Sequence, residues 1–397
     1  MVYFLLPYTP FEPVGGVHTV FDYVMRLNEL AGKNIAAVLA DSKYLKSWLP
    51  SSYQKVTVFP TNKKLSSFDT LVIPEVIVEE AKRYPSVKRK LLVVLNWKYF
   101  EDNIKSYSLQ QLGYSGILTN SEFSQKHLFS YAEDLPVWHV PHFINSNLFT
   151  PTIPISKRPK HSILIMNRKN TYHIPRILEF LKGFSHTVTI LNNIAPAKMP
   201  AQYTNHQIFI NLGYPEGFCR PAAEAMASGC LVVGFTGGGG TDFMVNDVNT
   251  LTAKDGNQVQ LIEQLNRALH MDGAEKELFA KHAREMIVTR YAKHKQALGI
   301  ALVFPKEIGK ILSSVDIAKM YKPKINPSNK RTRARITTVK TTKTVELLAY
   351  QFFQERHKYE ALTNSKFYKV WQGYCKTRDV VGRYFSHFKN TVKFSQA

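Results

Sequence analysis

The feature that most constrains this 397-residue sequence is residues 211–242, NLGYPEGFCRPAAEAMASGCLVVGFTGGGGTD. Pro221 suits a first helical turn, because the N–H that proline lacks would make no helical hydrogen bond there. Alanines and Met226 favour a helix after it, and Gly229 stands where a left-handed residue would end that helix. The apolar run 230–235 is typical of a strand buried on both faces. The stretch therefore predicts a loop, a helix, a strand and a glycine-rich loop.

Two acidic residues frame the predicted loop and helix. Glu216 precedes the turn and Glu224 lies inside the helix, with seven residues between them. The backbone N–H groups of residues 218–222 would point outward at the helix start, where the helix dipole favours an anion. Carboxylates on either side of such an anion site accept hydrogen bonds from hydroxyl groups. This combination predicts binding of a diphosphate joined to polyhydroxylated groups, as in a nucleotide sugar.

The pattern Glu-Gly-Phe-x-x-Pro-x-x-Glu-Ala-Met-Ala-x-Gly-x-x-Val-Val, followed by a Gly-Gly loop, resembles the donor-site signature of glycosyltransferase family 4. These enzymes retain the anomeric configuration and have the GT-B fold, in which two Rossmann-like doubly wound domains face a cleft. The resemblance implies that Glu216 contacts hydroxyls of the donor sugar and that Glu224 holds the ribose. It implies a diphosphate-binding segment between them, made of Gly217, Phe218, Cys219 and Arg220. The chain departs from the family at Cys219, where Gly is usual, and at Arg220, where an apolar residue is usual. Arg220 would then add a phosphate contact or face solvent.

Two cations follow the predicted strand 162–166. Asn167 and Arg168 stand where the family has a Gly-Arg pair, and Lys169 follows directly. The family has a lysine about five residues after its pair, a position that His173 takes here. The resemblance implies that Arg168 and Lys169 hold the donor diphosphate. A guanidinium grips phosphate oxygens as a fixed fork, and a lysine adds a point charge. With Glu216 they form the predicted catalytic set, the alternative being a solvated basic turn.

Two glycine segments complete the candidate site. Gly15 and Gly16 follow the predicted strand 2–6 and precede a helix expected from about Val17. Such a pair lets a ligand approach the backbone, as a similar Gly-Gly loop does in the family; a plain tight turn is the alternative. Gly238 and Gly239 follow strand 230–235 and are expected to face the donor sugar or its phosphates. The last two residues of the 211–242 stretch, Thr241 and Asp242, are candidates for helix capping.

Strands and helices alternate along the chain, which predicts an α/β protein with parallel doubly wound sheets. The expected strands are 2–6, 34–40, 70–73, 91–95, 116–119, 162–166, 187–191, 208–212 and 230–235. Later helical periodicity covers 258–269 and 274–298. We expect an acceptor-side domain over 1–152, a donor domain over 153–320 whose last helices cross back as in the family, and a basic tail over 321–397. Asn96, Trp97 and Lys98 follow a strand and are expected to line the acceptor or donor cleft.

The tail carries most of the net charge of +22. Its last 76 residues, from Lys322, hold 17 lysines and arginines against four acids. Residues 344–362 and 366–394 have helical patterns, and in the second an apolar face with Trp371 lies opposite a basic face. Such a helix suits an anionic membrane surface. Two alternatives stay open: packing on the enzyme's own body, and binding of nucleic acid, which is the less favoured partner.

The cysteines and the length of the apolar runs indicate the cellular compartment. The three cysteines, Cys219, Cys230 and Cys375, form no C-x-x-C pair, which indicates a reducing compartment. No apolar run approaches the ~20 residues of a spanning helix. We therefore expect a cytoplasmic protein, peripheral on the inner face of the membrane if the tail binds there.

The function predicted is sugar transfer, with retention, from a nucleotide diphospho-sugar to a glycan or to a lipid-linked or cell-surface polysaccharide acceptor. The transferred group would be a hexose or deoxyhexose. No Asp-x-Asp pair, His-Glu-x-x-His or Walker sequence is present, so we expect neither a metal nor a further cofactor. The alternative is a non-catalytic GT-B-like protein that binds a glycan, a nucleotide or a nucleic acid.

Overall fold

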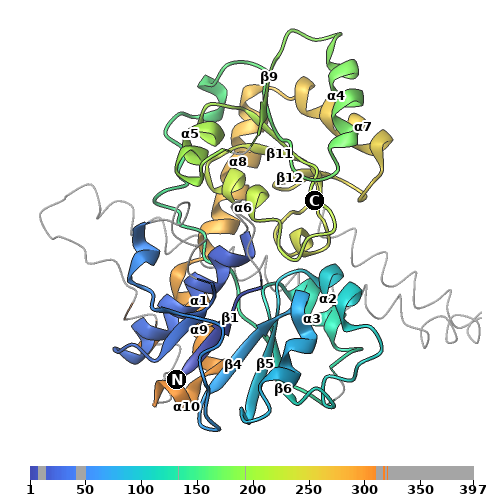
Figure 1. Ribbon diagram of the computed structural model, residues 1–397. Coiled ribbons are helices and arrows are strands. Elements are labelled where there is room, and N and C mark those ends of the chain that lie inside the picture. The colour runs from blue at the N-terminus through green and yellow to red at the C-terminus, as the bar shows by residue number, and fades with distance from the viewer. Residues whose placement is uncertain are drawn as a thin grey trace, which may run out of the picture. The chain divides into compact units, whose positions relative to one another are not determined.

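The structure is a computed structural model, and it describes residues 1–7, 15–41, 51–132, 134–192, 194–309, 316–317 and 320 (Figure 1). The predicted tail helices 344–362 and 366–394 lie outside these residues, so their membrane contact stays a prediction. Among the described helices, none is both long enough and apolar enough to cross a bilayer.

A first sheet of seven parallel strands occupies the N-terminal part of the chain, in the order β3-β2-β1-β4-β5-β6-β7. Its strands are β1 (Val2–Leu5), β2 (Ala36–Leu39), β3 (Val58–Phe59), β4 (Thr70–Pro74), β5 (Arg89–Val94), β6 (Tyr114–Thr119) and β7 (Val137–His139). All but β3 and β7 were predicted. These strands have only two and three residues, too few for a period to show.

A second sheet of five parallel strands has the order β12-β11-β10-β8-β9. Its strands are β8 (Ser162–Met166), β9 (Thr187–Leu191), β10 (Ile208–Asn211), β11 (Leu231–Phe235) and β12 (Thr250–Ala253). The first four were predicted and β12 was not. In both sheets the order reverses beside the first strand, and at such switch points the carboxyl ends of the strands form a ligand site.

Helices cover both faces of both sheets. One face of the first sheet packs against α1 (Gly15–Ala31), α9 (Lys293–Val303) and α10 (Pro305–Ile308). The other packs against η2 (Glu75–Arg83), α2 (Trp97–Ile104) and α3 (Glu122–Leu128). The second sheet lies between α5 (Met199–Thr204), α6 (Arg220–Ala227) and α8 (Gly273–Arg290) on one side, and α4 (Ile174–Leu181) and α7 (Gln258–His270) on the other. Short 3-10 turns lie at 51–55, 155–157, 171–173, 196–198 and 239–242.

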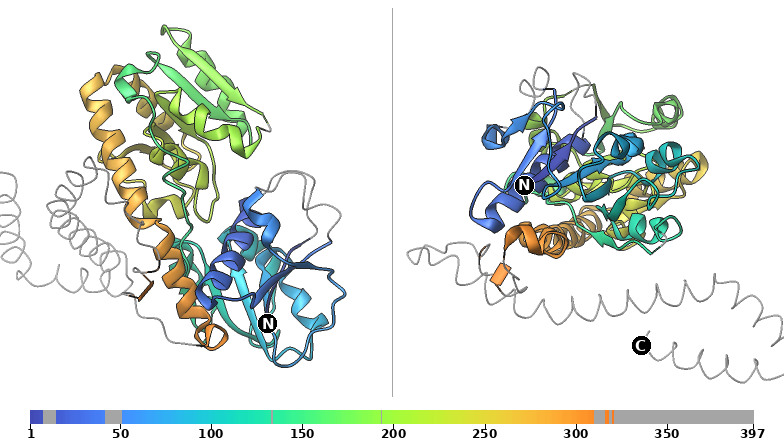
Figure 2. Two further views of the ribbon diagram at one scale, coloured as in Figure 1. Left: turned by 90° about the vertical axis from the view of Figure 1, so that its left-hand side faces the viewer. Right: turned by 60° about the horizontal axis from the view of Figure 1, so that its bottom comes forward.

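The continuous helix predicted over 274–298 is wrong, because the chain breaks between α8 and α9. Tyr291 leaves the helical conformation, with φ −111° and ψ 30°, and Ala292 is extended. The Tyr291 ring is buried against Phe218 and Phe243 of the second domain, and its carbonyl accepts the Ile144 amide. The break redirects the chain, so α8 packs on the second domain and α9 packs beside α1 of the first (Figure 2).

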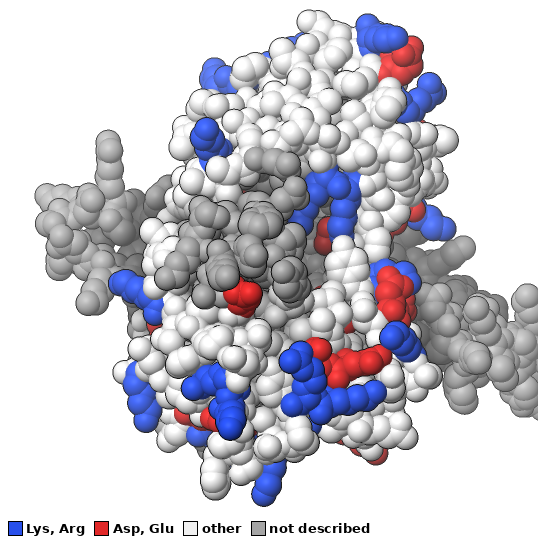
Figure 3. Space-filling model, in the orientation of Figure 1, with Lys and Arg blue, Asp and Glu red and all other residues white. Residues whose placement is uncertain are grey.

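Charged side chains of both signs are interspersed on the face drawn in Figure 3. Many pair with a neighbour, as Lys98 does with Asp102 at 2.6 Å. Exposed pairs of this kind contribute little to stability.

We expect Phe304→Ala to destabilise the protein by about 3–5 kcal/mol, because it removes a large buried ring. Phe304 is fully buried, and its ring centre lies 6.1 Å from that of Phe4 in β1. Urea unfolding measures the effect. Leu302→Ala is the control, since Leu302 is 61% exposed in α9, two residues before Phe304. Equal losses from the two variants would contradict the packing of α9 and α10 on the first sheet.

Candidate functional site

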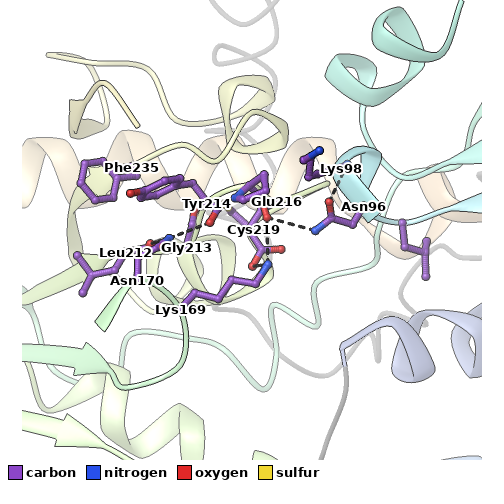
Figure 4. Close-up of polar contacts among 12 residues, drawn as sticks. Asn96, Lys98, Lys169, Asn170, Leu212, Gly213, Tyr214, Glu216, Cys219 and Phe235 are labelled. Atoms are coloured by element: carbon purple, nitrogen blue, oxygen red, sulfur yellow. Dashed lines mark hydrogen bonds and ion pairs between the residues drawn. The ribbon is translucent and has the colours of Figure 1, made fainter. Parts of the chain in front are cut away.

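The loop that follows β10 is tied to the loop that follows β8 by two side chains (Figure 4). Asn170 donates from Nδ2 to the carbonyls of Leu212 and Tyr214, each at 2.8 Å. Lys169 donates from Nζ to the Pro215 carbonyl at 3.0 Å and forms an ion pair with Glu216 Oε1 at 2.8 Å. The structure thus brings two of the three predicted catalytic residues into direct contact.

Arg168 differs from its neighbour. Its side chain is exposed, and it makes no ion pair within the described part of the chain. Next to the engaged Lys169, Arg168 is therefore the cation with a guanidinium open to an incoming anion. His173, at the place of the family's lysine, is buried, and desolvation lowers the pKa of its imidazole.

Glu216 is held by its backbone as well as by Lys169. Its amide donates to the Gly237 carbonyl at 2.7 Å, and its carbonyl accepts the Gly239 amide at 3.0 Å. These bonds pair the loop after β10 with the glycine loop after β11. The Glu216 side chain remains 27% exposed, and Lys169 takes only one of its carboxylate oxygens. No ion pair to the other oxygen is present within the described residues.

The glycines of this loop allow backbones to touch. A Cβ at Gly239 would lie 1.8 Å from the Gly217 carbonyl oxygen, and one at Gly217 would lie 1.9 Å from that of Leu95 in the first domain. Gly238 has φ +90° and lies against the rings of Phe123 and Trp97. Only glycine fits at these three positions.

Cys219 adopts the left-handed conformation, with φ 61°, immediately before α6. This explains why the related pattern has glycine there, since glycine adopts positive φ without steric cost. Cys219 is buried and its thiol donates to the Thr236 carbonyl at 3.0 Å. Burial raises the pKa of this thiol well above its usual range.

Some of the backbone amides that were expected to face an anion at the start of α6 already donate hydrogen bonds within the protein. The Ala222 amide donates to the Cys219 carbonyl at 3.1 Å, which corrects the prediction that it faces an anion. Gly217, Phe218, Cys219 and Arg220 donate no backbone hydrogen bond within the described residues. The Phe218 side chain is buried, with its ring centre 4.3 Å from that of His142 in the first domain.

Glu224 and Arg220 are paired with each other. Arg220 donates from Nε to Glu224 Oε1 at 2.8 Å, a pairing that was not predicted, and its expected phosphate contact stays a prediction. Nη1 of Arg220 lies 3.9 Å from Oδ2 of Asp22 in α1. Desolvation raises the pKa of Glu224, and the charge of Arg220 opposes this shift. Glu224 therefore lies at an ion pair that links the two domains.

Gly15 and Gly16 form the first turn of α1, which corrects the expected loop before Val17. A Cβ at Gly15 would meet no atom within 4 Å, and one at Gly16 would meet Leu95 at 3.4 Å. The hydroxyl of Thr19 donates to the Gly15 carbonyl at 3.1 Å and lies 3.3 Å from His142 Nδ1. This chain of contacts connects the start of α1 to Phe218.

Asn96 lies after β5, where the carboxyl end of this strand approaches the loop after β10. It caps α2 by accepting the Lys98 amide. Its Nδ2 donates across the domains to the Pro215 carbonyl at 3.2 Å, and its own amide donates to Glu75 at 2.9 Å. Glu75 is buried, and desolvation raises the pKa of its carboxyl to about 7.

Asp242 caps a helix, but not one in its own domain. Its carboxylate accepts the amides of Glu122 and Phe123 at 2.6 and 3.1 Å, at the start of α3. A carboxylate at a helix N-terminus compensates free amides and the helix dipole. The hydroxyl of Ser121, the residue before α3, also caps this helix by accepting the Ser124 amide.

Several residues that shape the site were not singled out from the sequence: Asp22, Glu75, Asn170 and Asp255. Asp255 accepts the amides of Thr236 and Gly237 at the start of the glycine loop. A signal existed for Asp22, which is an acid in a mainly apolar helical stripe and has Arg26 one turn later. Glu75 also had such a signal, since it directly follows a buried strand.

Within the described residues, no group of three or more potential ligands could hold a metal ion.

Comparisons with known proteins agree with this arrangement. Residues 181–286 match the family model "Glycosyl transferases group 1", which spans the 211–242 stretch. No curated protein matches the chain. The resemblance to glycosyltransferases that the motif predicts is therefore confirmed.

Three solved structures share the fold. A glycosyltransferase from Rickettsia africae has a TM-score of 0.58 at 14% identity, covering 77% of this chain and 98% of its own. Sucrose-phosphate synthase from Thermosynechococcus elongatus has a TM-score of 0.56 at 14% identity, covering 78% and 99%. HepE from Anabaena, solved with UDP-glucose, has a TM-score of 0.56 at 15% identity, covering 77% and 99%. The fold predicted from the sequence, GT-B, is confirmed.

We expect the stability cost of ionised Glu75 to grow with pH. The folded protein binds this proton more tightly than the unfolded chain, since the folded pKa is about 7. Stability therefore falls as the pH rises from the ordinary carboxyl range through 7. Glu75→Gln removes this penalty, so its stability relative to the wild type should rise by about 2 kcal/mol between about pH 5 and pH 8. Urea unfolding at both pH values measures this. Glu80→Gln, on the same η2 segment, should show no such trend, and a parallel trend would refute the assignment to Glu75.

We expect Gly239→Ala to destabilise the protein by about 1–3 kcal/mol, because its Cβ would overlap the Gly217 carbonyl oxygen. Thermal unfolding measures this loss. Gly183→Ala is the matched control, since the nearest atom to its added Cβ lies at 4.0 Å. If both variants kept wild-type stability, the close backbone contact at Gly239 would be wrong.

Proposed function

We propose that this protein transfers a hexose or deoxyhexose from a nucleotide diphospho-sugar to a glycan or lipid-linked acceptor, with retention at the anomeric carbon. The observation that carries the proposal is the Lys169–Glu216 ion pair beside the start of α6. It places a cation, a carboxylate and free amides at the carboxyl ends of β8 and β10. The GT-B neighbours and the family match of residues 181–286 support transfer of a sugar.

Each group has a distinct part in the proposed reaction. Arg168, Lys169 and the amides from Gly217 to Arg220 neutralise the diphosphate as it leaves. The free oxygen of Glu216 accepts from a sugar hydroxyl, and Glu224 accepts from the ribose. Donors fixed in advance stabilise developing charge without a reorganisation cost.

The atoms balance without a protein nucleophile. The bond between the anomeric carbon and the phosphate oxygen breaks while a bond to the acceptor oxygen forms on the same face. The acceptor's proton passes to the leaving phosphate. Lys169 must release Glu216 in part when the diphosphate arrives, because one ammonium group then serves two anions.

UDP-hexoses are the first donors to test, since the Anabaena HepE structure holds UDP-glucose. On the acceptor side, Asn96 and Trp97 stand at the end of β5 beside the glycine loop. We assign this edge to the acceptor. We expect the reaction to need no metal ion, which activity in the presence of a chelator would test.

We expect Glu216→Gln to lower kcat/KM for the donor by about 10²–10³-fold, because a neutral amide neither pairs with Lys169 nor accepts as strongly from the sugar. Release of free nucleotide from a panel of UDP-, GDP- and ADP-sugars measures this. Glu179→Gln is the matched control, since Glu179 forms an exposed pair with Lys182 at 2.6 Å in the same domain.

Two outcomes separate an enzyme from a binding protein. A wild-type protein that binds a nucleotide sugar but never releases free nucleotide, with or without glycan acceptors, would be a non-catalytic GT-B-like protein. Equal activity of Glu216→Gln and the wild type would remove Glu216 from the reaction.

A further inference from the structure

Arg220 lies between two carboxylates that belong to different domains. It is the first residue of α6, and its Nε donates to Oε1 of Glu224 one helical turn later, at 2.8 Å. On its other side, Nη1 lies 3.9 Å from Oδ2 of Asp22 in α1. One guanidinium thus connects the proposed ribose-binding carboxylate to the first domain.

Asp22 is built into the first domain and is not a surface acid. It is 7% exposed, on a helix whose inner face is otherwise largely apolar. The Tyr53 hydroxyl donates to Asp22 Oδ1 at 2.9 Å, whereas Arg220 lies beside Oδ2. Burial raises the pKa of Asp22, and Arg220 is the main group that opposes this shift. A buried carboxylate is costly unless a cation compensates it, and for Asp22 Arg220 contributes more than Arg26, one turn along α1.

Arg220 is in turn incompletely satisfied. Its Nη1 is buried and donates no hydrogen bond within the described residues. A separation of 3.9 Å permits an ion pair but exceeds the ~3 Å of a hydrogen bond. A movement of about 1 Å between α1 and α6 would create a charge-assisted hydrogen bond between Arg220 and Asp22. The contact is therefore sensitive to small changes in how the two domains meet.

We propose that Asp22 and Arg220 are positioning residues for nucleotide binding, and that the second domain's grip on the ribose depends on a carboxylate of the first. Asp22 holds the guanidinium, which pairs with Glu224 and fixes its orientation. Arg220 donates to Oε1 of Glu224, and we assign the ribose hydroxyl to Oε2. This inference rests on the proposed function. It adds a link that the related sequence pattern, with an apolar residue at position 220, does not contain.

The test uses the full chain and measures binding of UDP, GDP and ADP by calorimetry. For the nucleotide that binds most tightly, Asp22→Asn should raise Kd about tenfold. Donor KM should rise equally, with kcat at saturating donor within about twofold, because Asp22 does not touch the reacting atoms. Asp247→Asn is the matched control, since Asp247 forms an exposed pair with Arg267 in the second domain. Its Kd should equal that of the wild type.

A double-mutant cycle shows whether Asp22 acts through Arg220. Arg220→Leu should weaken binding by about as much as Asp22→Asn, and adding Asp22→Asn to it should have no further effect. Tyr53→Phe removes one hydrogen bond to Asp22 and should raise Kd about two- to threefold. It tests the same link if Asp22→Asn fails to fold.

The outcomes are distinguishable. If the wild type binds none of the three nucleotides, the proposed function fails, and this inference with it. If the wild type binds but Asp22→Asn and Tyr53→Phe bind equally well, this inference alone is overturned. Tighter binding by Asp22→Asn would also overturn it, because Arg220 would then be a phosphate ligand that Asp22 restrains. Additive effects in the double variant would show that Asp22 acts independently of Arg220.

Discussion

The candidate site depends on backbone touching backbone at glycine. At Gly217 and Gly239, the space for a side chain is taken by the carbonyl oxygens of Leu95 and Gly217. This steric constraint stacks three segments: the end of β5, the loop after β10 and the glycine loop after β11. Glu216 lies within that stack, paired to Gly237 and Gly239 through its own backbone. A carboxylate on such a support loses little entropy on binding a hydroxyl, since its position is already fixed.

Around this support, polar side chains cross between the domains. Asn96 reaches the Pro215 carbonyl, Asp242 caps α3, and Arg290 pairs with Glu122. Their partners are mostly backbone groups, which a mutation of a side chain cannot remove. Contact between the domains is therefore polar and directional, as expected where domains must part to exchange substrate and product.

Much of the fold could be predicted from the sequence because buried parallel strands are continuous apolar runs. Predictions failed where a signal was short or non-local. The two residues of β3 show no period, and the break at Tyr291 depends on rings from Phe218 and Phe243 that lie far away in the sequence. In the site, the motif identified Glu216 and Glu224, but the contact of Arg220 with the first domain could not be predicted, since Asp22 lies almost 200 residues away. Cys219 shows the reverse case, where a departure from the related pattern is explained by a single backbone angle.

The break between α8 and α9 also has a consequence for synthesis. The first domain is not one continuous piece of chain, because its β1 packs against Phe304 and its α1 against α9. A ribosome must therefore translate the whole second domain before the first can bury its last apolar surface. Because domains generally fold in the order in which they are made, the second domain completes its core while the first still waits for a helix. The domain that contains the first residues to be synthesised is then the last to complete its fold.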